Sequence, residues 1–418
     1  MPESAPLHLA IALEGAGWHP AAWRAPDARA GELFTPAYWL DLVQEAERGL
    51  VDFVTIEDSV GVRPARYDAS DPEESPGRVQ GRLDAVLTAA RVAPLTRHIG
   101  LVPTVTVTHS EPFHASKAIA TLDYVSSGRA GLRVQLSARP YEAALFGRRT
   151  FTHRIEDRDD PAVATLVTDL FDEAADYVEV VRRLWDSWED DAVIRDAATG
   201  RFVDRDRLHY IDFSGKWFSV KGPSITPRPP QGQPLVTALA HATVPYRFAA
   251  RSADVVYVTP SDAAQARAVE REVRAEQAAA GRDREPLHVF GDLVVFLDAT
   301  EAEAVARKER LDELAGEAFV SDAPVFTGTP AGLADRLLEW RAAGLSGFRL
   351  RPAAVPHDLL ALTRGLVPEL QARGAFRREY EAGTLRGLLG LGRPASRYAT
   401  ASGSPADSPA TATAPATA

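Results

Sequence analysis

Two histidines and a carboxylate stand close together at His109, Glu111 and His114. Imidazole and carboxylate groups are common zinc ligands, so a metal site has to be considered. The spacing argues against one, because the helical HExxH pattern places its histidines four residues apart, whereas these are five apart with Pro112 between them. We predict no metal here. Two interpretations stay open: Glu111 begins a helix whose dipole it complements, or His109 belongs to the polar wall of a ligand pocket.

Aromatic and charged residues follow the first two predicted strands. Trp18 and His19 lie in the loop after the first strand, where a flat apolar ring with a polar tip suits either core packing or stacking on a planar ligand. Glu57 and Asp58 end the second strand, and a charge there is costly inside a core but not at the rim of a barrel. We therefore predict that both segments contribute to a binding site.

A third polar cluster ends the fourth predicted strand. Arg133, Gln135 and Ser137 alternate along it, and alternate residues of a strand point to the same face. Three inward polar side chains need partners, which a bound ligand can supply.

Composition excludes several classes of chemistry and partner. The 418 residues include no cysteine, which removes disulfides, thiolate metal sites and a cysteine nucleophile. With 47 basic and 58 acidic side chains the net charge is −11, which disfavours nucleic acid and anionic membranes as partners. Gly15 and Gly17 begin a dinucleotide-binding fingerprint, but Pro20 stands where its third glycine belongs.

The N-terminal segment and the hydropathy pattern predict a cytoplasmic protein. Met1 to Pro6 shows no basic region followed by an apolar run, and no stretch of the sequence approaches 18 uninterrupted apolar residues.

Strand and helix patterns alternate along the chain, as in a parallel sheet built from βα units. Eight strands are predicted, the number that closes a (β/α)8 TIM barrel of the α/β class. They span Leu7 to Leu13, Phe53 to Ile56, Ile99 to Val107, Leu132 to Ser137, Leu235 to Leu239, Val255 to Val258, His288 to Leu297 and Phe348 to Leu350.

Nearly a hundred residues separate the fourth and fifth strands, more than one crossover helix needs. We predict a large insertion over about 138–233, with a helix from Asp172 to about Asp191 and a hairpin of Leu208 to Ile211 with Trp217 to Val220. The chain then forms one barrel domain over 1–398. Residues 399–418 hold only small side chains and proline, and we expect this tail to be disordered.

Several blocks of sequence resemble the flavin-dependent monooxygenases of the bacterial-luciferase-like family, in the branch of nitrilotriacetate and dibenzothiophene-sulfone monooxygenases. The similarity covers nearly everything except the ends. The blocks LWDSWEDDA and VPELQ are specific to this branch. The similar residues are 56–58, 111–131, 184–192, 230–234, 328–330, 347–350, 366–371 and 376–380.

The resemblance implies a single barrel that binds reduced FMN at the carboxyl ends of its strands and uses it with dioxygen to oxygenate a small organic substrate. A separate NAD(P)H-dependent flavin reductase would supply the reduced flavin, and family members usually form homodimers or homotetramers. Flavin contacts are expected at Asp58, Thr104, Ser137 and His241. Substrate contacts are expected at Trp18, His19 and Tyr67, with His109 hydrogen-bonding to the oxygenated flavin or the substrate.

The chain also departs from the family pattern. Relatives read GWNVVTS where residues 131–137 read GLRVQLS, and they carry a histidine and a tyrosine where Val167 and Phe171 stand. A Gly- and Ser-rich phosphate turn is replaced by residues 239–245. Two accounts are open: His241, Thr243 and Arg133 supply replacement contacts, or the site takes the deazaflavin F420 or has lost its cofactor and only binds a ligand.

Overall fold

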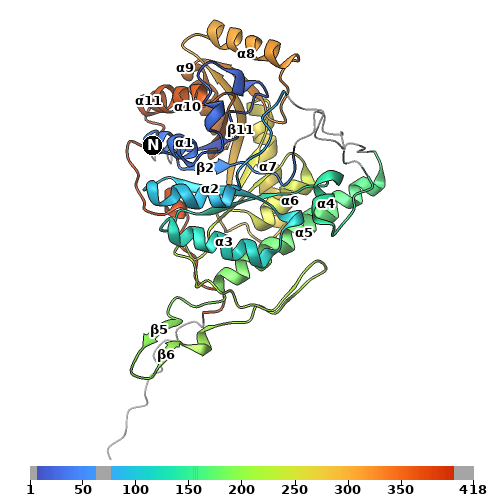
Figure 1. Ribbon diagram of the computed structural model, residues 1–418, viewed down its shortest axis with the longest axis vertical. Helices are drawn as coiled ribbons and strands as arrows, with labels where there is room; N and C mark the ends of the chain where they lie inside the picture. The colour runs from blue at the N-terminus through green and yellow to red at the C-terminus, as the bar shows by residue number, and fades with distance from the viewer. Residues whose placement is uncertain (1–6, 63–76, 154, 156, 158, 400–418) are drawn as a thin grey trace, which may run out of the picture.

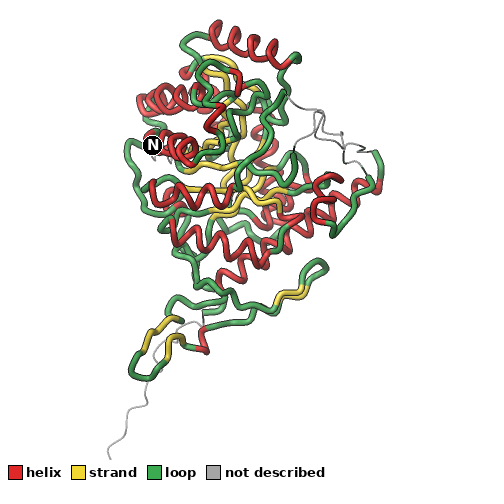
Figure 2. The backbone as a smooth tube through the Cα atoms, in the orientation of Figure 1, coloured by secondary structure: helices red, strands yellow, loops and turns green. Residues whose placement is uncertain are grey.

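Eight parallel strands close into a ring in the computed structural model, which describes residues 7–62, 77–153, 155, 157 and 159–399. Each strand of the ring pairs with the next, and the last pairs with the first, so the predicted TIM barrel is confirmed. Figure 2 shows these strands in the middle of the barrel with helices around them. The strands are β1 His8–Leu13, β2 Phe53–Ile56, β3 Gly100–Thr106, β4 Gly131–Gln135, β9 Leu235–Leu239, β10 Val255–Val258, β11 His288–Leu297 and β13 Gly347–Pro352.

The predicted strands β2, β9, β10 and β11 have the observed bounds, and the other four differ by at most two residues at either end. One strand of the main sheet was not predicted. β12, Val325–Gly328, pairs with the second half of β11 but not with β13. It escapes prediction because it is short and only half-buried, and it lies beside the ring rather than in it.

Helices surround the ring and begin with strong capping signals. Proline occupies the first turn of α1, α3, α5 and α9, where its missing N–H costs nothing. Thr300 and Glu303 form a reciprocal capping box on α8. The principal helices are α1 Pro36–Arg48, α2 Ala85–Val92, α3 Pro112–Val125, α5 Pro161–Asp186, α6 Thr243–Ser252, α7 Ala263–Ala279, α8 Glu301–Ala315, α9 Pro330–Ala342, α10 His357–Ala361 and α11 Val367–Ala372.

The segment between β4 and β9 contains both a barrel helix and additional structure. α5 begins eleven residues earlier than predicted, ends at Asp186 and packs between α3 and α6, so it is the crossover helix of the fourth βα unit (Figure 1). Before it lies the short α4, Pro140–Phe146. After it comes an unpredicted hairpin of β5 Val193–Asp196 and β6 Arg201–Val203, which projects away from the barrel (Figure 1).

The predicted hairpin is partly wrong. Its strands are β7 Phe213–Ser214 and β8 Ser219–Val220, whereas Leu208 forms an isolated bridge with Trp188. Ile211, the last residue of the predicted first strand, still contacts the other side, because its amide donates to Lys221 O at 2.9 Å.

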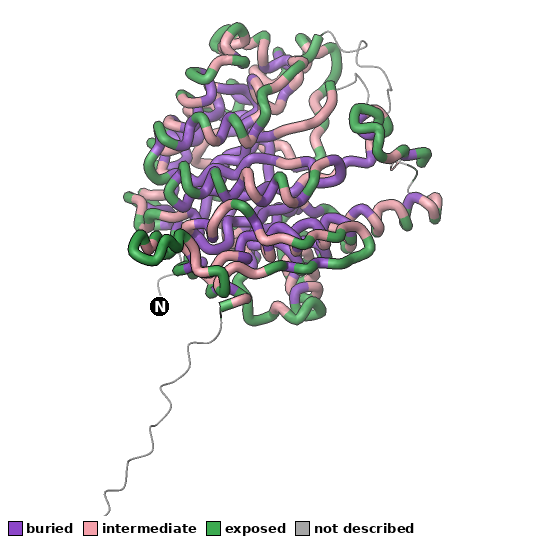
Figure 3. The backbone as a smooth tube through the Cα atoms, turned by 60° about the horizontal axis from the view of Figure 1, so that its bottom comes forward, coloured by how far each residue is buried: buried purple, intermediate pink, exposed green. Residues whose placement is uncertain are grey.

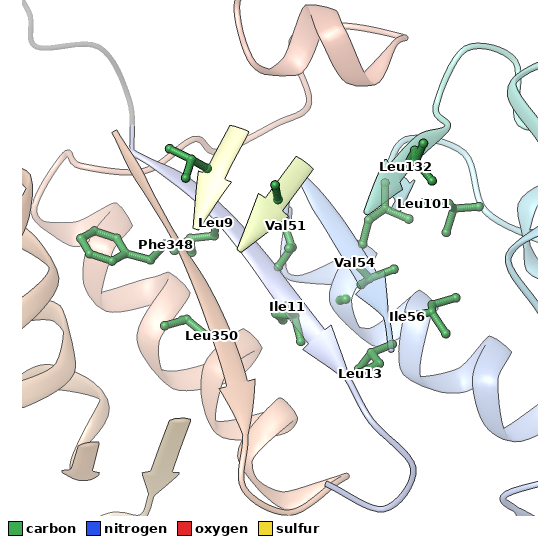
Figure 4. Close-up of a cluster of buried hydrophobic side chains, with 14 of the residues drawn as sticks. Leu9, Ile11, Leu13, Val51, Val54, Ile56, Leu101, Leu132, Phe348 and Leu350 are labelled. Carbon is green, nitrogen blue, oxygen red and sulfur yellow. The ribbon is translucent and has the colours of Figure 1, made fainter. Parts of the chain in front are cut away.

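Side-chain alternation divides the core into two shells. Outward-pointing Leu9, Val54, Leu132 and Leu350 pack against the helices (Figure 4). Inside the ring, apolar strand residues meet Leu385 and Leu389 from the region of α12, Leu385–Leu388. Figure 3 shows buried stretches of the chain gathered in the middle of the molecule and exposed stretches mostly at its periphery. Gly100, at the start of β3, packs against Leu385, so the apolar plug fills the amino end of the barrel. Polar side chains such as Glu57, Asp58 and Arg133 line the carboxyl end instead.

Within the part of the chain that the structure describes, no helix is both long enough and apolar enough to cross a membrane.

Candidate active site

A cavity of about 550 Å³ opens at the carboxyl ends of the strands. Ligands of TIM barrels bind at this end, because the loops that follow the strands meet there. Its wall combines the loop after β1, the ends of β2, β4, β9 and β13, helices α4 and α5, and the segment before β12. The lining residues are Trp18, Glu57, Asp58, Ser59, Arg78, Arg133, Val134, Gln135, Leu136, Arg139, Tyr141, Phe171, Leu239, Asp322 and Arg351.

A buried network of ion pairs lies beneath this cavity. Glu57 binds Arg133 at 3.0 Å and Arg349 at 3.1 Å, and Asp292 binds Arg349 at 2.8 Å and also Arg351. Burial alone would raise the pKa of Asp292, but the two arginines hold it below its usual value. Charges this deep persist only with several partners each. The network therefore gives the cavity an ionised and well-anchored floor.

Strand alternation brings these charges together. Arg349 and Arg351 are two residues apart on β13, so both point into the barrel, and Asp292 of β11 is in register with Arg349. None of these three residues was predicted to belong to the site. Their signal was the presence of charges inside otherwise apolar strands, one at Asp292 of β11 and two at alternate positions of β13.

Asp58 lines the cavity as a half-buried carboxylate. Its two oxygens accept hydrogen bonds from the amides of Ser59 at 2.7 Å and Ala85 at 2.9 Å, and its carbonyl accepts from Gln135 Nε2 at 3.1 Å. Burial raises its pKa. Asp58 thus ties the end of β2 to the start of α2 and to β4 while remaining at the cavity wall.

Thr104 and Ser137 are buried next to the cavity but are not among the described residues that line it. The Thr104 hydroxyl accepts a hydrogen bond from Arg133 Nη1 at 3.1 Å. The Ser137 hydroxyl accepts from the Arg139 amide at 3.2 Å, and its own amide donates to Thr108 Oγ1 at 3.0 Å. Both residues contact lining arginines instead of the open space.

His241 follows β9, with a side chain that is 40% exposed. Its Nδ1 lies 2.8 Å from Thr259 Oγ1, and its Nε2 lies 3.5 Å from the carboxylate of Asp322. Asp322 lines the cavity and also binds Arg351 at 2.6 Å. His241 therefore reaches the cavity through Asp322.

The predicted substrate residues have different surroundings. Trp18 lines the cavity, with the Arg351 guanidinium 4.4 Å from its ring centre. His19 is 1% exposed, and both ring nitrogens have partners: Nε2 bonds to Asp312 at 3.0 Å and Nδ1 accepts from the Ala21 amide at 3.1 Å. Tyr67 lies outside the described residues.

His109 is not brought to the cavity. Its ring stacks on Phe146 of α4, with centres 5.0 Å apart, and meets the edge of Phe151 at 6.3 Å. The side chain is 93% buried by this packing, and Nε2 has no hydrogen-bond partner. Burial lowers its pKa. Position after β3 correctly indicated the carboxyl end of the barrel, but α4 covers the ring.

Comparison with known proteins identifies the fold and its chemistry. The luciferase-like monooxygenase family matches residues 16–319. Nitrilotriacetate monooxygenase component A of Aminobacter aminovorans is 30% identical, over 94% of this chain and 98% of the relative. N-acetyl-S-(2-succino)cysteine monooxygenase of Bacillus subtilis (strain 168) is 29% identical, with the same coverage. The chain belongs to the luciferase-like monooxygenase family.

The protein is a flavin-dependent monooxygenase, and FMN is the cofactor of its relatives. The structure of riboflavin lyase with modified FMN and riboflavin is 25% identical, with a TM-score of 0.80 over 94% of this chain and 97% of that one. The F420-dependent tetrahydromethanopterin reductase of Methanopyrus kandleri shares only the fold, at 15% identity and a TM-score of 0.57 over 87% of this chain and 99% of that one. F420 is therefore the less supported cofactor.

The cavity fits the ring system of FMN. Its volume lies within the range of small-molecule sites, and Trp18, Phe171 and Leu239 provide apolar wall. Two lining residues carry buried donors without a partner, Trp18 Nε1 and Arg133 Nε. Because buried donors are normally hydrogen-bonded, these two atoms suit a planar ligand that carries carbonyl and ring-nitrogen acceptors, as flavin does.

The proposed replacements for the phosphate turn are already engaged. The Thr243 hydroxyl donates to Glu272 at 2.7 Å, Arg133 binds Glu57, and His241 contacts Thr259 and Asp322. Arg139 instead stands at the cavity wall, where its guanidinium donates to Glu142 at 2.9 Å. A guanidinium at a cavity wall is the group best suited to a phosphate.

Proposed function

We propose that this chain oxygenates a small organic substrate in the cavity above the Glu57–Arg133 ion pair, with reduced FMN bound there. When bound, reduced FMN would supply the two electrons with which dioxygen gives one oxygen atom to the substrate and the other to water. The observation that carries the proposal is the pair of unpartnered buried donors, Trp18 Nε1 and Arg133 Nε, on residues that line one cavity.

In this proposal the chain's own groups bind and orient the flavin ring. Trp18 and Phe171 provide apolar contact, while Trp18 Nε1 and Arg133 Nε donate to ring acceptors. Asp58 contributes a carboxyl at the same wall, with a pKa raised by burial. Tyr141 and Leu136 help to exclude water, which prevents loss of the reactive oxygen to solvent.

Three further predicted flavin residues hold residues of the cavity wall in place. Thr104 orients Arg133 through its hydroxyl, and Ser137 fixes the backbone of Arg139. His241 acts on the wall through Asp322. Of the predicted substrate residues that the structure describes, Trp18 lines this cavity, and His19 supports the loop that carries it.

Anaerobic titration with reduced FMN tests the proposal. We expect saturable binding, and we expect Trp18→Phe, which keeps an aromatic body but removes the indole donor, to weaken it about fivefold, since a net hydrogen bond is worth about 1 kcal/mol. The control is Trp340→Phe, because the Trp340 indole nitrogen is also buried without a partner but lines no part of the cavity. Absence of saturable binding, or equal effects of the two substitutions, would contradict the proposal.

We also propose that the chain receives reduced FMN from a flavin reductase, forms a homo-oligomer and is located in the cytoplasm. The reductase is supported by the relative named component A, which implies a further component. The homo-oligomer is supported by the resemblance to the family. Copurification with a reductase and light scattering of the purified protein test the first two.

A further inference from the structure

A second cavity, of about 480 Å³, adjoins the first. It lies between the loop after β1, the start of the segment before α2 and the segment that joins α8 to β12. Trp18, Arg78 and Asp322 line both cavities. We propose that this second cavity is a substrate chamber for a small molecule with an apolar body and a carboxylate group, and that Trp18 separates it from the flavin. The inference rests on the proposed function.

Trp18 is held firmly enough to act as a partition. Its amide donates to Pro352 O at 3.0 Å, and the next amide donates to Ala353 O at 2.9 Å. Gly17 has a φ of +128°, and a Cβ there would lie 2.4 Å from Ala353 O, so glycine is required for this close approach. On the indole face, the Arg351 guanidinium is itself fixed by Asp292 and Asp322.

The chamber offers an apolar surface. Its wall includes Phe319, which packs against the His19 ring with centres 5.0 Å apart. The two nitrogens of His19 are engaged by Asp312 and Ala21, so this residue offers a ligand no free polar atom. Val320, also in the wall, is 85% exposed. Covering such a side chain is favourable, and an apolar substrate body can do so.

One cation of the chamber can change its partner at small cost. Arg78 pairs with Glu317 at 2.8 Å, and the two side chains are 41% and 63% exposed. Exposed pairs of this kind contribute little, so a substrate carboxylate can replace Glu317, which then returns to solvent. The other lining acids have their own cations: Glu14 binds Arg82 at 3.0 Å, and Asp322 binds Arg351. Arg78 is therefore the residue that selects an anionic substrate.

A matched pair of probes tests the chamber: 3-phenylpropionate and the neutral 3-phenylpropanol, with binding measured by calorimetry or ligand-observed NMR. We expect the acid to bind wild-type protein at least tenfold more tightly than the alcohol. Arg78→Ala should weaken binding of the acid about tenfold and leave the alcohol unchanged. Arg373→Ala is the control, because Arg373 forms a comparable pair with Asp335 and lines neither cavity.

Reduced FMN provides the second measurement. In wild-type protein we expect the acid and reduced FMN to bind together, whereas Trp18→Ala should join the cavities and make the two compete. Competition in wild-type protein, no binding of either probe, or an acid affinity indifferent to Arg78→Ala would overturn the inference. Failure of FMN to bind while acid binding still depends on Arg78 would instead overturn the proposed function and leave the chamber in place.

Discussion

At the scale of single residues, α4 covers one of two side chains that follow the neighbouring strands β2 and β3. His109 and Asp58 both follow barrel strands, and both were predicted to contact the bound molecules. Asp58 lines the cavity, whereas the His109 ring lies between Phe146 and Phe151. The difference arises because the strand end specifies the end of the barrel, while the packing of α4 decides which side chains it covers.

We predict that His109→Phe retains the fold and removes part of its acid sensitivity. The pKa of His109 is lowered from about 6.5 by burial, so the unfolded chain binds a proton more readily than the folded one and stability falls as pH drops below that value. Phenylalanine fills the same aromatic site without titrating. Urea unfolding at pH 7 and pH 5 measures the difference.

The companion variant His109→Ala leaves a cavity between the two phenylalanine rings, and we expect it to lose about 2 kcal/mol at pH 7. If His109→Phe keeps the wild-type pH dependence, or is as unstable as His109→Ala, the packing role is wrong.

At the scale of elements, one buried carboxylate joins four parts of the fold. Asp254 precedes β10 and binds Arg182 of α5 at 2.9 Å and Arg386 of α12 at 3.3 Å, and it accepts from the Val236 amide of β9 at 2.9 Å. Burial alone would raise its pKa, but the two arginines and the amide lower it to about 2. The barrel, its fourth helix and the plug at its amino end therefore depend on one ion cluster.

We predict that Asp254→Asn costs about 3–5 kcal/mol at pH 7, because it leaves two buried guanidinium groups without their counter-charge. A depressed carboxyl pKa stabilises the fold above its unfolded value near 3.8, and this stability is lost as pH falls towards about 2. The variant should therefore lose less stability than wild type over this range in denaturant titrations.

Asp335→Asn serves as the matched control, because Asp335 pairs with Arg373 at 2.5 Å but is 73% exposed. Its effect should stay below about 0.5 kcal/mol. Similar losses in both variants would show that burial at Asp254 does not set the strength of its pairs.

At the scale of the whole molecule, the cofactor that the protein binds should raise its free energy of unfolding. A ligand at 100 times its dissociation constant adds about 2.7 kcal/mol to the free energy of unfolding. For a chain of 418 residues this raises the melting temperature by about 3 °C. We predict this shift with FMN and not with F420 in parallel thermal melts. Stabilisation by F420 alone would reverse the cofactor assignment.

The sequence was sufficient for the barrel because its evidence is local. Apolar runs such as Val255–Val258, bounded by breakers and separated by helical patterns, define strands wherever they lie. The short β12 and the β5–β6 hairpin lacked such a pattern and were not predicted. The insertion also appeared larger than it is, because spacing alone could not show that α5 packs as a barrel helix between α3 and α6.

The sequence by itself determined the family, the ring of eight strands and the end of it at which chemistry occurs, since hydrophobic alternation and motif blocks are properties of neighbouring residues. Only the tertiary structure decided which polar groups meet. Asp322 and Arg351 are 29 residues apart, and Glu57 and Arg349 are 292 apart. No local pattern pairs such charges, because their contact depends on how the closed sheet brings distant strands into register.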